Sequence, residues 1–401
     1  MNKISKAFLS LTITALFLCA CFDDSSSNSS DNGSENGGSG TELPTNPDSS
    51  AAFVDTVVEY VEPPTLSCEF VEGLQFESSP KPNTSYYIKS FGFYGDDLVA
   101  IPRHPNNYGL YGHDDDPPID TFYVKKSGAT SWEKLDAFKH YLYEQEGNKL
   151  CIVGKRLALI RAGGYAPDEG REICRSEDAR NWTCDPVEGD IHRDLWLTCD
   201  DKYFYKSEDN NLYYSEDAAN WTAIDFHFSD GISSIDAAFA NDTARFVVVT
   251  YIDPLNPKWS WQIALLHSKD MVSWDTTYVM GPTAFSLARL GDVYVLNAGW
   301  AGAGSLYYSK DLRNWTQTSL KSKEVIHGSI ATSNGVLVVV GARGHVYASR
   351  NGKDFKLQEA CGSKEDYVSV IADSKGNFYA LRGGQSGGLY GGKYDILRIV
   401  K

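Results

Sequence analysis

The chain has 401 residues, of which 37 are Lys or Arg and 53 are Asp or Glu, so its formal net charge is −16. A protein with this charge is not expected to bind nucleic acid or anionic lipid head groups through its general surface, because both are polyanions. The sequence also has no basic cluster, no P-loop and no dinucleotide fingerprint, so we expect no nucleic-acid partner and no cofactor.

Residues 1–21 have the pattern of an export signal rather than of a folded element. A positive start, a short apolar run and a tetrapeptide follow one another: Lys3 and Lys6, residues 7–17, and Leu18-Cys19-Ala20-Cys21. The tetrapeptide resembles a bacterial lipobox, which implies that Cys21 is the acylated first residue of the mature protein. An ordinary cleaved signal or a short membrane helix is the alternative, but the apolar run is too short to span a bilayer.

The lipobox resemblance implies a cellular address. The chain would be held on a membrane through the acyl chains on Cys21, since several chains together anchor a protein lastingly. Phe22 follows the cysteine in place of Asp, which resembles the sorting signal of outer-membrane lipoproteins. We therefore expect a lipid-anchored protein of the bacterial cell envelope, at the outer membrane.

Residues 22–52 are rich in Ser, Asn, Gly and Asp and almost free of apolar side chains. Such a segment cannot bury enough surface to fold, so we expect a disordered tether. A flexible chain of about 30 residues reaches on the order of 30 Å. Residues 53–85 form an N-terminal extension with two candidate strands, at 57–61 and 68–70, separated by Pro63-Pro64.

From residue 86 onward the chain repeats one pattern of Ser, Asp and Trp. Asp follows Ser after two residues and Trp follows it after six in four copies: Ser176, Asp178, Trp182; Ser215, Asp217, Trp221; Ser268, Asp270, Trp274; and Ser309, Asp311, Trp315. A weaker copy has Ser349, Asn351 and Phe355, and an eroded one runs from Ser127 to Trp132. Successive serines lie 39 to 53 residues apart, which brackets the period of about 40–45 residues of a four-stranded propeller blade.

Each copy has the composition of strands joined by a tight turn. A β-branched run such as residues 336–340 comes first, and a shorter strand such as 212–215 ends on the Ser. The Asp carboxylate can accept backbone N–H groups that the turn leaves over. The Trp opens the next strand and places a large apolar surface between neighbouring sheets. An all-β fold is therefore predicted.

The repeated unit resembles the Asp-box of sialidase-like propellers, whose usual pattern is Ser-x-Asp-x-Gly-x-Thr-Trp. Here the gap from Asp to Trp is one residue shorter, and the Gly is missing except at Gly352. A similar turn occurs in arabinanase-like glycosidase propellers. The resemblance implies a β-propeller of about seven four-stranded blades over residues 86–401, with the boxes at the rim and away from any active site.

We expect seven blades, with six or eight as alternatives, at residues 86–138, 139–187, 193–226, 233–279, 283–319, 326–359 and 367–400. In the last blade, residues 388–390 would be the third strand and 396–400 the fourth. Propellers often close their ring with a strand from one terminus, so residues 53–85 are a candidate for that strand, although the last blade looks complete without it.

Six cysteines follow Cys21, and an even number in an exported protein suggests disulfides. Cys174 and Cys184 flank one box turn symmetrically, so their sulfurs are expected to meet across a hairpin. Two further pairings are conceivable, Cys151 with Cys199 and Cys68 with Cys361, and buried thiols are the alternative. No metal site is expected, because neither CxxC nor a Cys/His spacing of that kind is present.

The long loops predict where a ligand would bind. Loops that join second to third strands gather on one face of a propeller, opposite the box turns, and long loops on a rigid frame usually carry binding. Trp259, Trp261 and Trp300 lie in or beside these loops and could stack on sugar rings; packing of the loops is the other interpretation.

Three arginines, Arg103, Arg343 and Arg382, each follow the second strand of the first, sixth and seventh blades, which are consecutive around a closed ring. Together they could hold a carboxylate or sulfate, whereas solvated surface ion pairs are the plain alternative.

No catalytic residue is assigned. A glycosidase needs two carboxylates across the scissile bond, and acidic residues on the predicted loop face occur at 114–116, 168–169, 190 and 194. A lyase would need a base such as His192 or His327, which nothing distinguishes from other histidines.

Three functions therefore remain open. The first is an envelope-anchored, non-catalytic propeller that recognises polysaccharide or an envelope protein at its loop face, or that scaffolds an assembly, as the Asp-box propeller of photosystem assembly factors does. The second is a glycan-active enzyme, a sialidase-like or arabinanase-like hydrolase or a polysaccharide lyase. The third is a structural envelope protein without a small ligand.

Overall fold

The computed structural model describes residues 58–71, 87–103, 121–136, 150–162, 171–187, 195–208, 211–226, 232–252, 261–279, 284–300, 303–318, 320, 330–341, 344–362, 367–382 and 395–400. The predicted signal (1–21) and tether (22–52) lie outside these ranges. The described residues form strands and one short 3-10 helix, η2 (Glu359–Cys361). None of the helical segments among them is long and apolar enough to cross a membrane.

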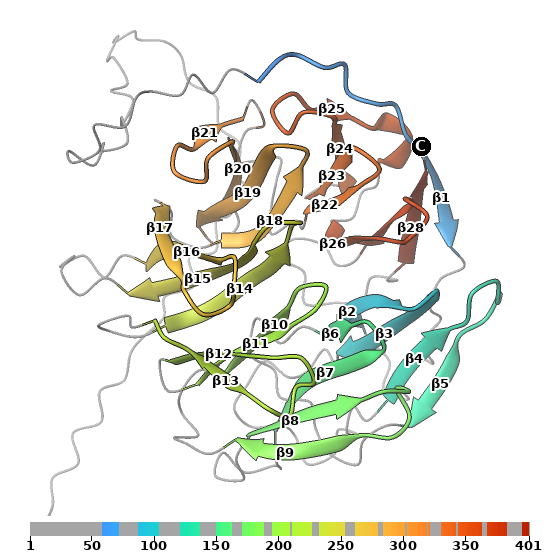
Figure 1. Ribbon diagram of the computed structural model, residues 1–401. Coiled ribbons are helices and arrows are strands. Elements are labelled where there is room, and N and C mark those ends of the chain that lie inside the picture. The colour runs from blue at the N-terminus through green and yellow to red at the C-terminus, as the bar shows by residue number, and fades with distance from the viewer. Residues whose placement is uncertain are drawn as a thin grey trace, which may run out of the picture. The chain divides into compact units, whose positions relative to one another are not determined.

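Seven antiparallel sheets of four strands each surround a common centre (Figure 1), so the predicted seven-bladed propeller is confirmed. Blades 1 to 3 consist of β2 (Tyr87–Tyr94), β3 (Asp97–Arg103), β4 (Thr121–Lys125) and β5 (Glu133–Asp136); β6 (Cys151–Val153), β7 (Arg156–Ala162), β8 (Arg171–Ser176) and β9 (Thr183–Val187); and β10 (Trp196–Cys199), β11 (Phe204–Glu208), β12 (Asn211–Ser215) and β13 (Thr222–Ile224).

Blades 4 to 6 repeat the same order. They consist of β14 (Ile232–Ala240), β15 (Arg245–Ile252), β16 (Trp261–Ser268) and β17 (Asp275–Val279); β18 (Ala284–Leu290), β19 (Val293–Trp300), β20 (Ala303–Ser309) and β21 (Thr316–Gln317); and β22 (Ile330–Ser333), β23 (Val336–Val340), β24 (Val346–Ser349) and β25 (Lys356–Leu357). The first strands of successive blades lie side by side, which places them innermost.

The last blade is assembled from both ends of the propeller and corrects the sequence prediction. β26 (Tyr367–Ala372), β27 (Phe378–Arg382) and β28 (Asp395–Val400) are its first three strands, and β1 (Ser67–Val71) is the fourth. Residues 396–400 are thus part of the third strand, not the fourth, and 388–390 lie outside the described residues. Ser67 lies opposite Val400 and Val71 opposite Ile396. The ring is closed by pairing a strand near the start of the propeller with its last strand.

The core consists of seven apolar clusters, one between each pair of neighbouring blades. β23 shows how one strand serves two of them, since all five of its residues are buried. Val336, Val338 and Val340 belong to the cluster with blade 7, whereas Leu337 and Val339 belong to the cluster with blade 5. Because successive side chains point to opposite faces of a strand, a strand covered on both faces must be apolar throughout, which explains the continuous β-branched runs.

Two faces follow from the strand order. We call the face that carries the second-to-third strand connections the loop face. The opposite one, with the first-to-second connections and the Ser–Asp turns, is the box face.

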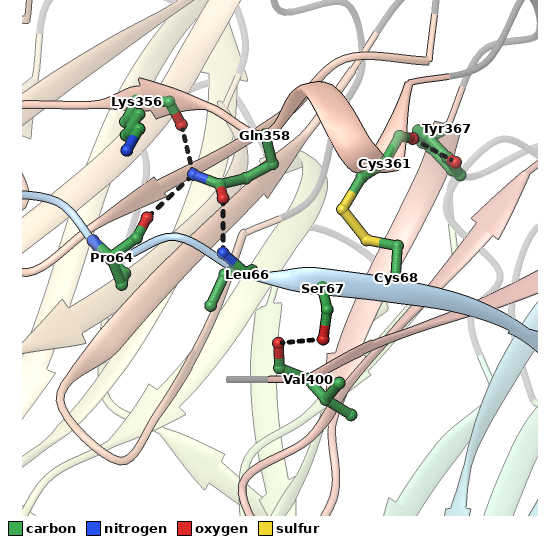
Figure 2. The surroundings of a disulfide bond; sticks show 9 residues. All are labelled: Pro64, Leu66, Ser67, Cys68, Lys356, Gln358, Cys361, Tyr367 and Val400. Carbon is green, nitrogen blue, oxygen red and sulfur yellow. Dashed lines mark hydrogen bonds between the residues drawn. A yellow bond between two sulfur atoms is a disulfide. The ribbon is translucent and has the colours of Figure 1, made fainter.

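Residues 58–66 precede β1 and form a clasp along the outside of blade 6. The predicted strand at 57–61 is wrong, because residues 58–61 are not in a strand. Val58 is buried in the cluster between blades 5 and 6. The side chain of Gln358 holds the other end, because its Oε1 accepts the N–H of Leu66 at 2.7 Å and its Nε2 donates to the carbonyl of Pro64 at 3.1 Å (Figure 2).

Two disulfides are present, Cys174–Cys184 across β8 and β9 and Cys68–Cys361 between β1 and η2 (Figure 2). The first confirms the pairing expected from the box symmetry. The second ties the ring-closing strand covalently to blade 6. The conceivable pair Cys151 and Cys199 is wrong: both residues contribute to the cluster between blades 2 and 3, but they remain thiols.

Candidate functional site

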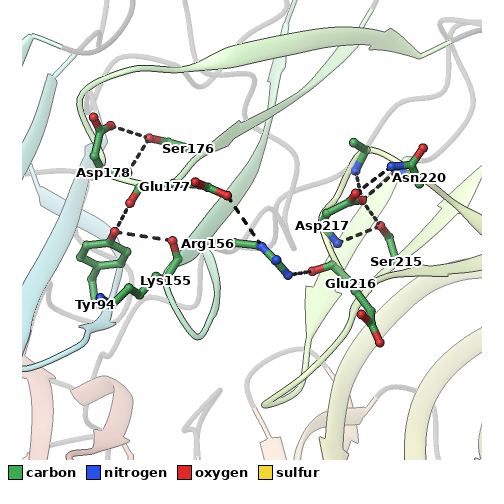
Figure 3. Close-up of polar contacts among 11 residues, drawn as sticks. Tyr94, Lys155, Arg156, Ser176, Glu177, Asp178, Ser215, Glu216, Asp217 and Asn220 are labelled. Carbon is green, nitrogen blue, oxygen red and sulfur yellow. Dashed lines mark hydrogen bonds and ion pairs between the residues drawn. The ribbon is translucent and has the colours of Figure 1, made fainter.

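The Ser–Asp turns connect the third and fourth strands of blades 2 to 5 and share one hydrogen-bond pattern. In blade 3, Ser215 Oγ donates to Asp217 Oδ1 at 2.9 Å, and the same oxygen accepts the N–H groups of Ala219 and Asn220 at 2.9 and 2.8 Å. The amide of Asn220 donates to Asp217 Oδ2 at 2.7 Å (Figure 3). One carboxylate therefore holds the whole turn, as expected from the sequence.

These contacts set the charge state of the box carboxylates. The N–H groups of Asn181 and Arg180 lower the pKa of Asp178 from 3.8 to about 2. Burial would raise the pKa of Asp217, but the N–H groups of Asn220 and Ala219 outweigh it and lower that pKa. Hydrogen bonds to the ionised form have this effect in general. The box carboxylates are thus fixed structural anions.

The residue after the box Asp explains how these turns work without the usual Gly. It has a positive φ in every copy: 61° at Ala179, 56° at Ala218, 64° at Met271, 64° at Leu312 and 73° at Gly352. The first two and Leu312 are buried in the clusters shared with the preceding blade, so their apolar contacts offset the backbone strain. The box aromatic residue packs beside them in the same clusters, as Trp182, Trp221 and Trp315 do.

Blade 6 has an inverted box. In blades 2, 3 and 5 the box Asp accepts from the side chain of an Asn three residues later, whereas here Asn351 Nδ2 donates to Asp354 Oδ2 at 2.8 Å. The same amide also donates to the carbonyl of Glu59 in the clasp at 2.8 Å. A carboxylate could not donate this bond. The Asn that made this copy look weak is therefore what connects the box to the clasp.

Neighbouring blades are also linked by polar groups on the box face (Figure 3). Tyr94 Oη of blade 1 donates to the carbonyl of Glu177 in the blade 2 box. Arg156 Nη1 of blade 2 donates to the carbonyl of Glu216 in the blade 3 box at 2.7 Å. Each donor comes from the preceding blade and bonds the residue between the box Ser and Asp.

A hollow of about 400 Å³ lies between blades 2 and 3 on this face, lined by Val153, Gly154, Lys155, Arg156, Glu177, Asp201, Lys202 and Glu216. Its cations are largely paired: Lys202 Nζ lies 3.3 Å from Glu216 Oε1, and Arg156 Nε lies 3.9 Å from Glu177 Oε1. None of the described residues that line the hollow is aromatic.

A second cavity of about 340 Å³ lies between blades 7 and 1, and we call it the seam groove. It is lined by Glu69, Phe93, Asp96, Leu98, Lys125, Lys126, Ser127, Gly128, Ala129, Asp373, Lys375, Tyr379 and Arg398. Sequence reasoning missed it. The signal that could have found it is the eroded box of blade 1, which comes next to the blade without a Ser–Asp turn.

The predicted ligand residues lie at strand ends on the loop face where the structure describes them. Arg103 ends β3 and Arg382 ends β27, in blades 1 and 7, which are neighbours. Trp261 begins β16 and Trp300 ends β19, in the neighbouring blades 4 and 5. Two pairs of adjacent blades thus each place two of these residues on one face.

The remaining sequence candidates lie outside the described residues. These are Arg343, Trp259, the acidic residues at 114–116, 168–169, 190 and 194, and the two histidines His192 and His327.

No family model matches the chain, and a search of curated proteins finds no significant match. Solved propeller structures are similar. The WD40 repeats of RRP9 give a TM-score of 0.55 at 12% identity, covering 84% of this chain and 99% of that one. A structure described as YCF48 bound to D1 peptide gives 0.52 at 10%, covering 86% and 97%.

A catalytically inactive virginiamycin B lyase from Staphylococcus aureus with quinupristin gives a TM-score of 0.52 at 7% identity, covering 84% of this chain and 99% of that one. At such identities the likeness establishes the fold alone. The chain is therefore a seven-bladed β-propeller.

Proposed function

We propose that this chain is a lipid-anchored binding propeller of the bacterial cell envelope, which holds a polysaccharide or an envelope protein at its loop face without catalysis. The observation that carries this proposal is the placement of Arg103 and Arg382, and of Trp261 and Trp300, at strand ends of one face of a closed frame. Aromatic and guanidinium groups on a rigid support are the usual anchors of binding surfaces.

None of the described carboxyl groups with a shifted pKa has a raised one, and the acidic candidates of the loop face at 114–116, 168–169, 190 and 194 lie outside the described residues. Each one whose pKa departs from the usual value has a lowered pKa, as Asp97, Asp270 and Asp373 do in addition to the box residues above. A general acid that works near neutral pH needs a raised pKa. The solved propeller that holds a D1 peptide is a precedent for a polypeptide ligand on this fold.

The cellular address is supported by the cysteines and by the N-terminal sequence. Two disulfides fit an oxidising compartment outside the cytoplasm. The lipobox at Leu18–Cys21 and the tether of residues 22–52 supply the anchor in this proposal. Mass spectrometry of the mature N-terminus tests it: a diacyl- or triacyl-cysteine at position 21 is expected, and any other first residue removes the anchor.

The binding experiment uses affinity gels that contain plant, bacterial or host polysaccharides, and envelope extracts from the source cells. We expect retention without product release, and we expect the triple substitution Trp259→Ala, Trp261→Ala and Trp300→Ala to abolish it. Tyr60→Ala is the matched control, since it removes an aromatic side chain that is 72% exposed on the clasp.

Retention that survives the triple substitution contradicts the loop-face site. Release of shortened or unsaturated sugar products shows instead that the alternative, a glycan-active enzyme, is correct.

A further inference from the structure

At the junction between blades 7 and 1, no described turn residue fills the space between the two blades as the residue after the box Asp or Asn does in front of blades 2 to 6. In blades 2 to 6 the residue after the box Asp or Asn points at the preceding blade, so closely in blade 6 that a Cβ on Gly352 would meet Val295 Cγ2 at 2.7 Å. The corresponding turn of blade 1 has no box Asp. A Cβ on its Gly128 would meet nothing within 4 Å. The seam groove is the space that this turn leaves open.

Two aromatic rings form an apolar wall of the groove. Phe93 of blade 1 and Tyr379 of blade 7 meet edge to face, with ring centroids 5.0 Å apart and planes at 73°. Both side chains are half-buried and belong to the cluster between these blades. Burial and the neighbouring Asp373 raise the pKa of the Tyr379 hydroxyl, so the ring is neutral.

Some of the charged groups around this wall have ion-pair or hydrogen-bond partners, and others do not. Arg398 pairs with Glu69 at 2.7 Å. Lys126 pairs with Asp97 at 2.8 Å. Asp373 accepts the N–H groups of its own turn, from Lys375 at 2.9 Å and from Asn377 at 2.8 Å.

Two ammonium groups are then left over. Lys125 is half-buried and points to this side of β4, and Lys375 is exposed at the tip of its turn. Neither lysine has an ion pair among the described residues. The exposed carboxylate of Asp96, which also lines the groove, likewise has no ion pair among them. Counted with Asp97, the groove has four cations and four carboxylates, so its net charge is close to zero in a chain whose net charge is −16, and Lys125 and Lys375 are the two cations without a paired carboxylate among the described residues.

From these features we propose that the seam groove binds a saccharide residue that bears a carboxylate, such as a uronic acid. The apolar face of the sugar ring packs on Phe93 and Tyr379, and its carboxylate lies between Lys125 and Lys375. A volume of about 340 Å³ lies near the lower end of ligand pockets, which suits one or two sugar rings better than a peptide segment. This site is on the box face and does not depend on the proposed loop-face function.

The test is calorimetric titration of the full chain in detergent with an oligogalacturonate. We expect saturable binding that weakens with salt, and no binding of the fully methyl-esterified oligomer, which has lost its charge. The double substitution Lys125→Ala and Lys375→Ala should weaken binding about tenfold or more, as the loss of charge-assisted hydrogen bonds does. Lys155→Ala, which removes a cation from the hollow between blades 2 and 3, should leave binding unchanged.

Equal affinity of the double variant and the wild type overturns the proposal. Equal affinity for a short poly-glutamate peptide also overturns it, because the groove would then recognise charge alone. The triple Trp variant separates this site from the loop face: it should bind the oligogalacturonate normally, and loss of binding in that variant alone would place the ligand on the loop face instead.

Discussion

At the scale of single residues, buried apolar contacts in the box turns offset the cost of a strained backbone. A non-glycine residue with positive φ costs on the order of 1 kcal/mol or more, yet four of the five boxes use one. Ala179, Ala218 and Leu312 are at most 7% exposed, and each buried methylene contributes about 0.8 kcal/mol. In blade 6, Val293 and Val295 of the preceding blade lie too close to position 352 for a side chain to fit there. This position is therefore a Gly, the residue that the usual Asp-box pattern contains.

Gly352→Ala tests this account. The new Cβ would lie 2.7 Å from Val295 Cγ2 and 3.0 Å from Val293 Cγ1, so we expect a loss of about 2–4 kcal/mol in the free energy of unfolding from overpacking and backbone strain together. Gly335→Ala is the matched control, since its φ of 69° is similar but its Cβ would meet nothing within 4 Å; backbone strain alone costs about 1 kcal/mol there. Urea denaturation measures both, and equal losses would refute the packing argument.

At the scale of elements, the two disulfides differ in how much chain they enclose. Cys68 and Cys361 are 293 residues apart, whereas Cys174 and Cys184 are 10 apart. In the chain-entropy model a bridge stabilises a protein by restricting its unfolded state, and longer loops gain more. The long bridge also fixes β1, the strand that completes the last blade.

We expect serine substitution of Cys68 and Cys361 to lower the free energy of unfolding by about 4–5 kcal/mol, and the same change at Cys174 and Cys184 to lower it by about 2–3 kcal/mol. Urea unfolding under non-reducing conditions measures the difference between the two double variants. An equal loss in both variants, or a larger loss for the short bridge, would contradict the chain-entropy argument. It would show that the local contacts of β8 and β9 contribute more to stability than the covalent link between β1 and η2.

At the scale of the whole molecule, the repeats predicted the frame but left its closure open, because residues 53–85 were a candidate for the closing strand while the last blade looked complete without it. The Ser–Asp turns are local, so a pattern of seven residues such as 215–221 reveals them. β1 pairs with a strand more than 300 residues away. Residues 57–61 looked as strand-like as 68–70, and only the partner strand decides between them. The seam groove was hidden for a related reason, because it arises where a box is missing between the two ends of the repeat.

The same closure makes the junction of blades 7 and 1 the weakest point of the ring. Among the described residues its cluster has five buried hydrophobic side chains, namely Phe91, Leu98, Ala100, Leu381 and Ile396, whereas each of the other clusters has nine or more. Local opening is expected where few buried contacts oppose it. The clasp and its disulfide hold blade 7 to blade 6, on the other side of blade 7 from this junction.

Hydrogen exchange measured by mass spectrometry should therefore show a graded response. In the oxidised protein the amides of β1 and β27 should exchange faster than those of β15 and β16, whose residues are buried on both faces. When Cys68 and Cys361 are replaced by serine, β1, β28 and β27 should lose protection first, because β1 is then held by strand pairing and by the clasp alone. Uniform loss of protection across all seven blades would contradict a weak junction and would indicate that the ring opens as one cooperative unit.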